Sequence, residues 1–361
     1  MRLPLLPDSE AVDLDRVCAM VDRFIENGFT YFDTAAIYHR GESEIAFREA
    51  VAKRYPRDRY VIADKLSLMA IPTAEDVAPF FEKQFENLGV SYIDYYLLHA
   101  LGKESFEKAE RFGAFDFVKA KKKEGRVRHI GFSFHDSPEV LNEILTAHPE
   151  MEFVQLQVNY LDWEDKGVAS RRCIEVARAH GKPIIVMEPV KGGALADFTG
   201  DAMESMRASF PSFTPATVAL RFAASADGVF MVLSGMSNEE QLDDNIRAFR
   251  DFTPLTDQEK SIVLGIGESI KANTAIPCTS CRYCVEDCPM HIAIPEYFSA
   301  YNHLYRFGES ARGKARHRYE RAAREHGKAR DCIGCGKCEG HCPQHIAIRA
   351  SLQKIAKEFD V

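Results

Sequence analysis

The amino-acid sequence predicts an α/β protein: a (β/α)8 TIM barrel followed by a helix-rich C-terminal domain. Up to about residue 250, short β-branched and aromatic runs alternate with amphipathic helical patterns, as expected for βα units around a parallel sheet. Asp33, Lys65 and His99 close the first three predicted strands at separations of 32 and 34 residues, which is the length of one βα unit. Near residue 270 the chain becomes rich in cysteine. We therefore expect a barrel over residues 1–270 and a second domain over residues 271–361.

Seven segments of the barrel region are predicted as strands. They are residues 30–35, 59–66, 92–99, 129–134, 153–158, 183–188 and 228–235. Closing a barrel of this type requires an eighth strand. The remaining place for it is the apolar stub MRLPLL at residues 1–6. We therefore expect the first strand to be short or truncated.

Composition and charge exclude several classes of protein. The formal net charge of −8 argues against nucleic-acid binding, which depends on Lys and Arg neutralising phosphates. The sequence has no apolar run near the roughly 18 residues that a membrane span needs. Residues 1–10 contain two prolines and two acidic residues, where a signal peptide carries a long apolar stretch. These features predict a cytoplasmic protein with no nucleic-acid or membrane partner.

Eight of the ten cysteines lie in two copies of one motif. CTSCRYCVEDCPMHIAI at residues 278–294 matches CIGCGKCEGHCPQHIAI at residues 332–348 at a constant offset of 54. Each copy has the spacing C-x2-C-x2-C-x3-C-P of bacterial ferredoxins, in which the fourth cysteine binds the neighbouring cluster. The motif predicts a ferredoxin-like domain with two 4Fe-4S clusters. The expected crossed ligand sets are Cys278, Cys281, Cys284 and Cys342 for one cluster, and Cys332, Cys335, Cys338 and Cys288 for the other.

The cysteines have two alternative interpretations. Two structural zinc ions also use C-x2-C pairs, but zinc does not require a third cysteine and a fourth followed by proline. Purely structural clusters would stabilise a small domain, whereas crossed ligation brings clusters close enough to exchange electrons. We therefore expect electron transfer with a redox partner protein. The basic segment 312–330 either steers an acidic partner or is a solvated helix face.

Three segments of the barrel resemble the aldo-keto reductase superfamily. They are FDTAAIYHRGESE at residues 32–44, the DK pair at 64–65 and IDYYLLH at 93–99, and the resemblance extends over about residues 12–250. It implies a catalytic tetrad of Asp33, Tyr38, Lys65 and His99 acting on a small-molecule carbonyl substrate. Tyrosine is a weak acid, so the proton donor needs a nearby ammonium that stabilises the tyrosinate. Each residue alone has an ordinary structural explanation, but their order at barrel pitch favours an active site.

The same resemblance implies a dinucleotide site for NADH or NADPH. Ser133 and Gln155 match the positions that hold the nicotinamide amide, while Phe134 stands where Asn is usual and Met187 where an aromatic residue is usual. The residues that match the last phosphate-binding loop are Ser234, Gly235, Asn238, Gln241 and Asn245. Gly235 and Gln241 replace the basic pair that holds the 2′-phosphate of NADPH, so the choice of dinucleotide stays open.

Hydride transfer moves two electrons, whereas each cluster carries one. One interpretation is a barrel that reduces carbonyls with NAD(P)H beside clusters that exchange electrons with a partner. A second places FMN at the barrel mouth, with its phosphate on the backbone amides of Gly192, Gly193 or Gly235. A third is an electron-transfer protein whose barrel is a non-catalytic scaffold. The intact Asp33, Tyr38, Lys65 and His99 argue against the third, while the altered nicotinamide contacts at Phe134 and Met187 support the second.

Overall fold

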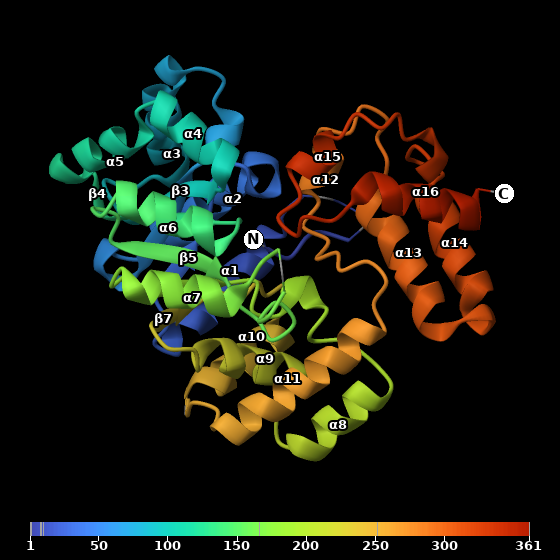
Figure 1. The fold of residues 1–361 in the computed structure, drawn as a ribbon. Helices are drawn as coiled ribbons and strands as arrows, with labels where there is room; N and C mark the ends of the chain where they lie inside the picture. The colour runs from blue at the N-terminus through green and yellow to red at the C-terminus, as the bar shows by residue number, and fades with distance from the viewer. Residues whose placement is uncertain (1, 8, 10, 166, 251, 361) are drawn as a thin grey trace. The chain divides into compact units, whose positions relative to one another are not determined.

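The computed structural model describes residues 2–7, 9, 11–165, 167–250 and 252–360 (Figure 1). Packing divides the chain into two compact units. The barrel unit comprises Met1–Glu164, Val168–Pro189 and Leu220–Leu255. The C-terminal unit comprises Asp165–Gly167, Val190–Ala219 and Thr256–Val361. The domain boundary near residue 270 stays a prediction, because packing alone does not say where a functional domain begins.

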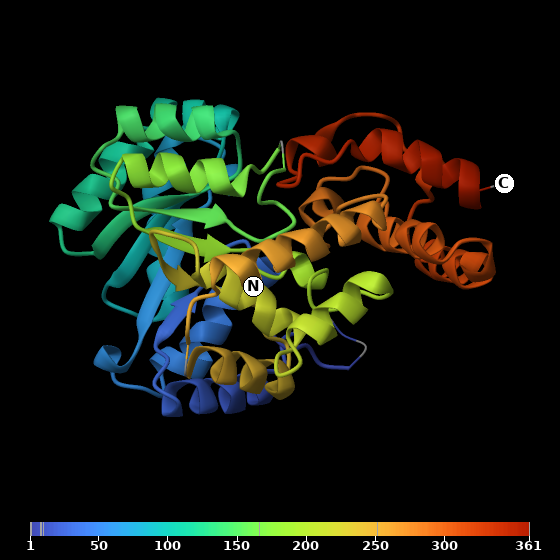
Figure 2. The ribbon, with the colours of Figure 1, turned by 60° about the horizontal axis from the view of Figure 1, so that its bottom comes forward.

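The barrel unit is built on one parallel sheet of seven strands in the order of the chain. The strands are β1 (Tyr31–Asp33), β2 (Val61–Leu66), β3 (Ile93–Leu101), β4 (Val127–Phe134), β5 (Phe153–Gln157), β6 (Ile184–Met187) and β7 (Val229–Val232). Each pairs with the next strand in the parallel sense, and the sheet curls as a half-barrel (Figure 2). All seven predicted strands are present, and the predicted fold class is confirmed.

The N-terminal stub does not form a regular strand in the described residues. Leu5 makes one isolated antiparallel bridge, to Val12. The backbone N–H of Leu3 donates to His39 Nε2 at 3.1 Å, and Ser237 Oγ donates to the carbonyl of Arg2 at 3.0 Å. Two prolines in the first seven residues lack the N–H groups that a ladder needs. The stub is therefore held by loops that follow β1 and β7.

Helices cover the sheet, as parallel strands require. They are α1 (Leu14–Glu26), α2 (Glu42–Phe47), α3 (Val77–Leu88), α4 (Lys103–Arg111), α5 (Ala114–Lys123), α6 (Pro138–Ala147), α7 (Ser170–Ala179) and α10 (Glu239–Arg250), while α9 (Pro215–Ala224) crosses the division between the units. Local sequence sets their ends: Asp13 caps α1, Ser137 caps α6 with proline next, and Gly89 ends α3 in a left-handed conformation. Strand residues such as Ile62 and Leu98 are fully buried beneath them.

The C-terminal unit is rich in helix, as predicted. Its helices are α8 (Asp201–Ser209), α11 (Asp257–Ala272), α12 (Tyr283–Glu286), α13 (Ile294–Phe307), α14 (Arg312–Ala322), α15 (Lys337–Gly340) and α16 (Ile348–Phe359). Tyr297 and Tyr319 form the centre of its core, with ring centroids 4.4 Å apart, and Phe359 stacks on Tyr319. In the described part of the chain, no helix combines the length and the apolar character that crossing a bilayer demands.

Candidate active site and metal centres

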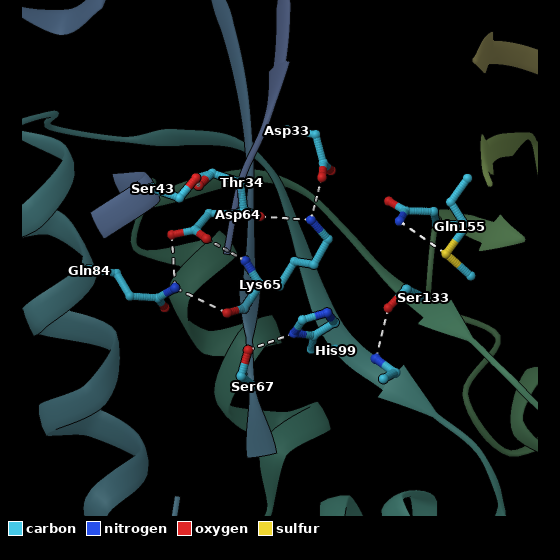
Figure 3. A network of polar contacts seen from close by, with 12 residues as sticks. Asp33, Thr34, Ser43, Asp64, Lys65, Ser67, Gln84, His99, Ser133 and Gln155 are labelled. Carbon is cyan, nitrogen blue, oxygen red and sulfur yellow. Dashed lines mark hydrogen bonds and ion pairs between the residues drawn. The ribbon is translucent and has the colours of Figure 1, made fainter. Parts of the chain in front are cut away.

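A buried lysine lies at the centre of the barrel site. Lys65, near the end of β2, has a fully buried side chain, and its Nζ donates to Asp33 Oδ1 at 2.6 Å and to the carbonyl of Thr34 at 2.7 Å (Figure 3). Asp33 is the last residue of β1, the strand beside β2. A buried ammonium is tolerated only when it is paired and hydrogen-bonded. The strand order therefore places a neutralising carboxylate where this lysine needs one.

Tyr38 and His99 lie beside this ion pair. Tyr38 begins a short 3-10 turn, η1 (Tyr38–Gly41), after β1. The centroid of its ring is 4.9 Å from Lys65 Nζ and 5.7 Å from the centroid of the His99 ring, with the two rings nearly perpendicular at 83°. The structure thus brings all four predicted residues, Asp33 included, to one end of neighbouring strands.

The position of His99 is set by an irregularity in β3. The register with β4 shifts between Leu98 and Leu101, and Ala100 adopts a left-handed φ of 54°. The N–H of Ala100 donates to Ser133 Oγ at 2.7 Å, and His99 Nδ1 lies 2.6 Å from Ser67 Oγ. Bulges of this kind redirect a side chain next to active sites. Ser67 was not predicted from the sequence, although its place two residues after Lys65 puts it on the same face of the chain.

Burial keeps His99 neutral. The pKa of its ring lies well below the ordinary value, first because the ring is buried and then because the Lys65 ammonium and His135 disfavour a second positive charge. At neutral pH one ring nitrogen therefore carries a hydrogen and the other accepts. The ring can act as a hydrogen-bond donor without being an acid.

Behind Lys65 lies a buried pair of carboxyl groups that the sequence analysis did not identify. Asp64 and Glu44 are both fully buried, and the amide nitrogen of Gln84 donates to Glu44 Oε1 at 3.1 Å, to Asp64 Oδ2 at 2.8 Å and to the carbonyl of Lys65 at 3.0 Å. Tyr96 donates to the amide oxygen of Gln84 at 2.5 Å. Burial, and for Asp64 also the neighbouring Glu44, raises the pKa of both carboxyl groups. Two carboxyl groups in such a buried place favour one shared proton over two charges. The N–H of Lys65 donates to Asp64 Oδ1 at 2.8 Å, which fixes the backbone at Lys65.

Because Asp64 and Glu44 have raised pKa values in the folded chain, we expect their contribution to the free energy of unfolding to fall as the pH rises. The folded chain retains a proton that unfolded carboxyl groups release above their ordinary pKa of about 4. With respect to the pair, the free energy of unfolding is largest below that pH and decreases by about 1.4 kcal/mol per pH unit until the shared proton is lost. Asp64→Asn keeps the shape and removes one titrating group, so urea unfolding at several pH values should show a flatter slope. Equal slopes in variant and wild type would contradict the shared proton.

The predicted nicotinamide residues lie on neighbouring strands. Ser133 of β4 and Gln155 of β5 are partners in register and both are buried. The amide nitrogen of Gln155 donates to Met187 Sδ at 3.5 Å. Its Oε1 is buried and has no hydrogen-bond partner among the described residues. A buried acceptor without a donor is costly, so this oxygen is suited to an incoming N–H group.

The predicted phosphate loop is held by its own hydrogen bonds. Its residues are Ser234, Gly235, Asn238, Gln241 and Asn245, and they lie between β7 and the first half of α10. Asn245 donates to Ser234 Oγ at 2.8 Å, and Asn238 Oδ1 accepts from the N–H of Gln241 at 2.9 Å. A Cβ at Gly235 would lie 3.1 Å from the side chain of Arg2. The loop residues thus lie together, with one basic side chain, that of Arg2, beside Gly235.

Gly192, the remaining predicted cofactor residue, lies elsewhere. It belongs to the C-terminal unit, and the space that a Cβ would take is filled by the carbonyl of Thr279. Its φ of 63° and this close approach explain the glycine.

Four cysteines line one pocket of the C-terminal unit. They are Cys278, Cys281, Cys284 and Cys342, three from the first motif and the fourth from the second. Thr279 and Gln344 also line this pocket. Burial, followed by the charges of Cys281 and Cys342, raises the pKa of Cys278 to about 12. Thiols gathered in this way resist ionisation unless a cation compensates them.

The other four cysteines are also near one another. Burial raises the pKa of Cys338 to about 11, with further contributions from the charges of Glu339, Cys332, Cys288 and Cys335. The two motifs have the same backbone, because left-handed residues recur at the offset of 54: Ser280 and Gly334, Arg282 and Gly336, His291 and His345. The helices α12 and α15 have the same offset. The duplication seen in the sequence is therefore a duplication of conformation.

Comparisons with known proteins agree with this description. Residues 5–267 match the Aldo/keto reductase family, and residues 277–347 match the 4Fe-4S dicluster domain. An uncharacterised oxidoreductase of Schizosaccharomyces pombe is 27% identical over 247 residues, covering 66% of this chain and 76% of that protein. The NADH-specific methylglyoxal reductase of Escherichia coli is 22% identical over 305 residues, covering 72% and 90%.

Solved structures show the same barrel. The holo form of an aldo-keto reductase from Bacillus halodurans aligns with a TM-score of 0.58 and 25% identity over 73% of this chain and 91% of that one. An aldo-keto reductase of Klebsiella pneumoniae in complex with NADPH aligns with a TM-score of 0.57 over 73% and 90%, and its identity of 19% supports the fold alone.

The fold and these matches define the class of protein: an oxidoreductase on a (β/α)8-type barrel that carries a 4Fe-4S dicluster domain. The family match spans well over half of the sequence. The chain therefore belongs to the aldo/keto reductase family.

Proposed function

We propose that this protein reduces a small-molecule carbonyl compound with NADH or NADPH, using Tyr38 as the proton donor. The observation that carries the proposal is the buried Lys65 ammonium, fixed by Asp33 at 2.6 Å and lying 4.9 Å from the centroid of the Tyr38 ring. An ammonium at this place stabilises the tyrosinate that remains after proton donation. No metal ion is required for that step.

Each member of the tetrad has a separate task. The dinucleotide, when bound, supplies hydride to the carbonyl carbon. Tyr38 gives its proton to the carbonyl oxygen, so one hydride and one proton yield the alcohol. Asp33 holds Lys65 in place, and neutral His99 donates a hydrogen bond from Nε2 to the same oxygen while Ser67 occupies Nδ1. The arrangement places donors where negative charge develops.

The dinucleotide fits the residues that are present. Gln155 Oε1 is a buried acceptor without a partner in the described residues, and the carboxamide of nicotinamide has N–H groups to donate. The phosphate loop of Ser234 and Asn238 precedes α10, whose N-terminus favours anions. FMN is the weaker candidate because Gly192, proposed for its phosphate, is packed against Thr279. The absorption spectrum of cofactor released by heat distinguishes the two.

We further propose that the C-terminal unit holds two 4Fe-4S clusters with crossed ligands. The pocket of Cys278, Cys281, Cys284 and Cys342 supports this arrangement, since it joins three cysteines of one motif to the fourth of the other. Thiols spread around a pocket suit a cluster, whereas zinc needs four thiolates about 2.3 Å from a single point. The clusters would exchange electrons with a redox partner protein. They are not needed for carbonyl reduction itself, because hydride from NAD(P)H supplies both electrons.

The proposed function is tested by steady-state oxidation of NADH and NADPH with small aldehydes under anaerobic conditions. Methylglyoxal is a suitable first substrate, because the name of the Escherichia coli relative specifies it. We expect saturable oxidation of at least one dinucleotide that depends on the aldehyde. A cluster-loaded protein that oxidises neither dinucleotide with any aldehyde in a broad series would contradict the proposal.

Ser67→Ala should lower kcat about tenfold. Losing a hydrogen bond of about 1.4 kcal/mol leaves the His99 ring free to adopt the other tautomer or orientation, in which Nε2 no longer donates. Ser43→Ala is a matched control, because Ser43 is equally buried and bonds Thr34 rather than His99. An equal effect of the two substitutions on kcat would contradict the role of Ser67.

A further inference from the structure

The segment that follows β6 contains a buried lysine that carbonyl reduction does not use. Lys191 is 5% exposed and begins the short 3-10 turn η6 (Lys191–Gly193) in the C-terminal unit. Its φ is 44°, a left-handed value that non-glycine residues adopt at a cost. Lysine is rarely so fully buried without a specific reason. A strained backbone and a buried cation in one residue call for an explanation.

The contacts of this turn lead to the first cysteine pocket. Gly192 packs so closely on Thr279 that no side chain could replace it, and Thr279 lies between Cys278 and Cys281. Lys191 Nζ donates to Gln344 Oε1 at 2.7 Å. Thr279 and Gln344 both line the pocket. The ammonium is therefore one side chain away from the space between the four cysteines.

The duplicated motif provides an internal comparison. Thr279 corresponds to Ile333 and Gln344 to Met290 at the offset of 54. Ile333 is 64% exposed, so no turn covers it, and Cys335 is exposed as well. Thr279, by contrast, is 2% exposed. The two cysteine sets share a backbone but differ in burial.

A cation also lies at each set on the exposed side, but it is paired with a carboxylate: Arg282 of the first pocket with Glu296, and Arg349, which donates to the carbonyl of Gly334, with Glu339. Lys191 is the buried cation of the first set, and its Nζ donates to a neutral amide oxygen.

We propose that Lys191 tunes the first cluster: its positive charge raises the reduction potential of the cluster bound by Cys278, Cys281, Cys284 and Cys342. The inference rests on the proposed function, because it requires that this pocket hold a cluster. Reduction adds negative charge, and a buried cation stabilises the reduced state more than the oxidised one.

The test is an anaerobic redox titration of the full chain, followed by electron paramagnetic resonance. Lys191→Met removes the charge at similar length, and Lys191→Arg retains it. Lys271→Met on α11 is a control at a half-buried lysine that is paired with Glu268. The signal of the first cluster is identified as the one that Cys278→Ser abolishes. In Lys191→Met this cluster should become about tenfold harder to reduce, which is a decrease of 59 mV in its one-electron reduction potential. The second cluster of Lys191→Met should keep its wild-type potential. Both clusters should keep their wild-type potentials in Lys191→Arg and in Lys271→Met.

Unchanged potentials in a cluster-loaded Lys191→Met chain would overturn the inference and leave the proposed clusters intact. A wild-type chain without cluster signals after anaerobic reconstitution would instead overturn the clusters themselves. If Lys191→Met does not assemble clusters, Gln344→Glu provides the test, because a carboxylate beside the ammonium cancels its charge. That variant should lower the potential of the same cluster, and an unshifted value would overturn the inference.

Discussion

Tyr38→Phe is expected to lower kcat for carbonyl reduction by about 10²–10⁴-fold, the range typical of a lost general acid. Phenylalanine keeps the aromatic ring, whose centroid lies 5.7 Å from that of the His99 ring, and removes only the hydroxyl group. Substrate and dinucleotide binding should change little, so the loss appears in kcat rather than KM. Steady-state kinetics with NADH or NADPH and an aldehyde measure both constants.

Tyr31→Phe is the matched control for this substitution. Tyr31 lies on β1, two residues before Asp33, and its buried hydroxyl has no hydrogen-bond partner among the described residues. The same chemical change there should leave kcat at the wild-type value. Wild-type turnover in Tyr38→Phe, with cluster content unchanged, would refute the tetrad and favour a barrel that serves as a scaffold.

Cys342→Ser should abolish the same cluster as Cys278→Ser, although the two cysteines belong to different motifs. Both line the first pocket, and a thiolate cluster that loses one of four ligands is destabilised or lost. Cys332→Ser should remove the other cluster. Electron paramagnetic resonance of the reduced proteins identifies which signal disappears in each variant.

The buried thiol of Cys173, on α7 outside both motifs, provides the control. Cys173→Ser should leave both signals intact. If Cys342→Ser and Cys332→Ser remove one and the same signal, each motif binds its cluster alone and crossed ligation is wrong.

The parts of the fold that could be predicted are those that leave a local pattern. Parallel strands buried on both faces appear as continuous apolar runs, so all seven observed strands were recognisable in the sequence. Asp33, Lys65 and His99 end three neighbouring strands, and a parallel sheet necessarily brings such ends together. That geometry predicts that these three side chains lie near one another, whereas the place of Tyr38 beside them was implied by the resemblance to the aldo-keto reductases.

Features that depend on contacts between distant segments could not be predicted. Asp64 and Glu44 are 20 residues apart in the chain and both accept from Gln84 of α3, and nothing in the local sequence marks either carboxyl as buried. The loop glycine Gly192 looked like a phosphate ligand, but its neighbour is Thr279, 87 positions further along the chain. The eighth strand was expected from barrel closure, whereas the described residues of the stub form one isolated bridge, at Leu5.

The most direct test of the central claim is transfer of deuterium from the dinucleotide to the product. The enzyme is incubated with NADH or NADPH deuterated at the transferring position of nicotinamide C4, and with methylglyoxal or another accepted aldehyde. Mass spectrometry of the alcohol should show one deuterium on the former carbonyl carbon, and Tyr38→Phe should slow its appearance. An alcohol formed without deuterium would contradict hydride transfer at the site of Lys65 and Tyr38.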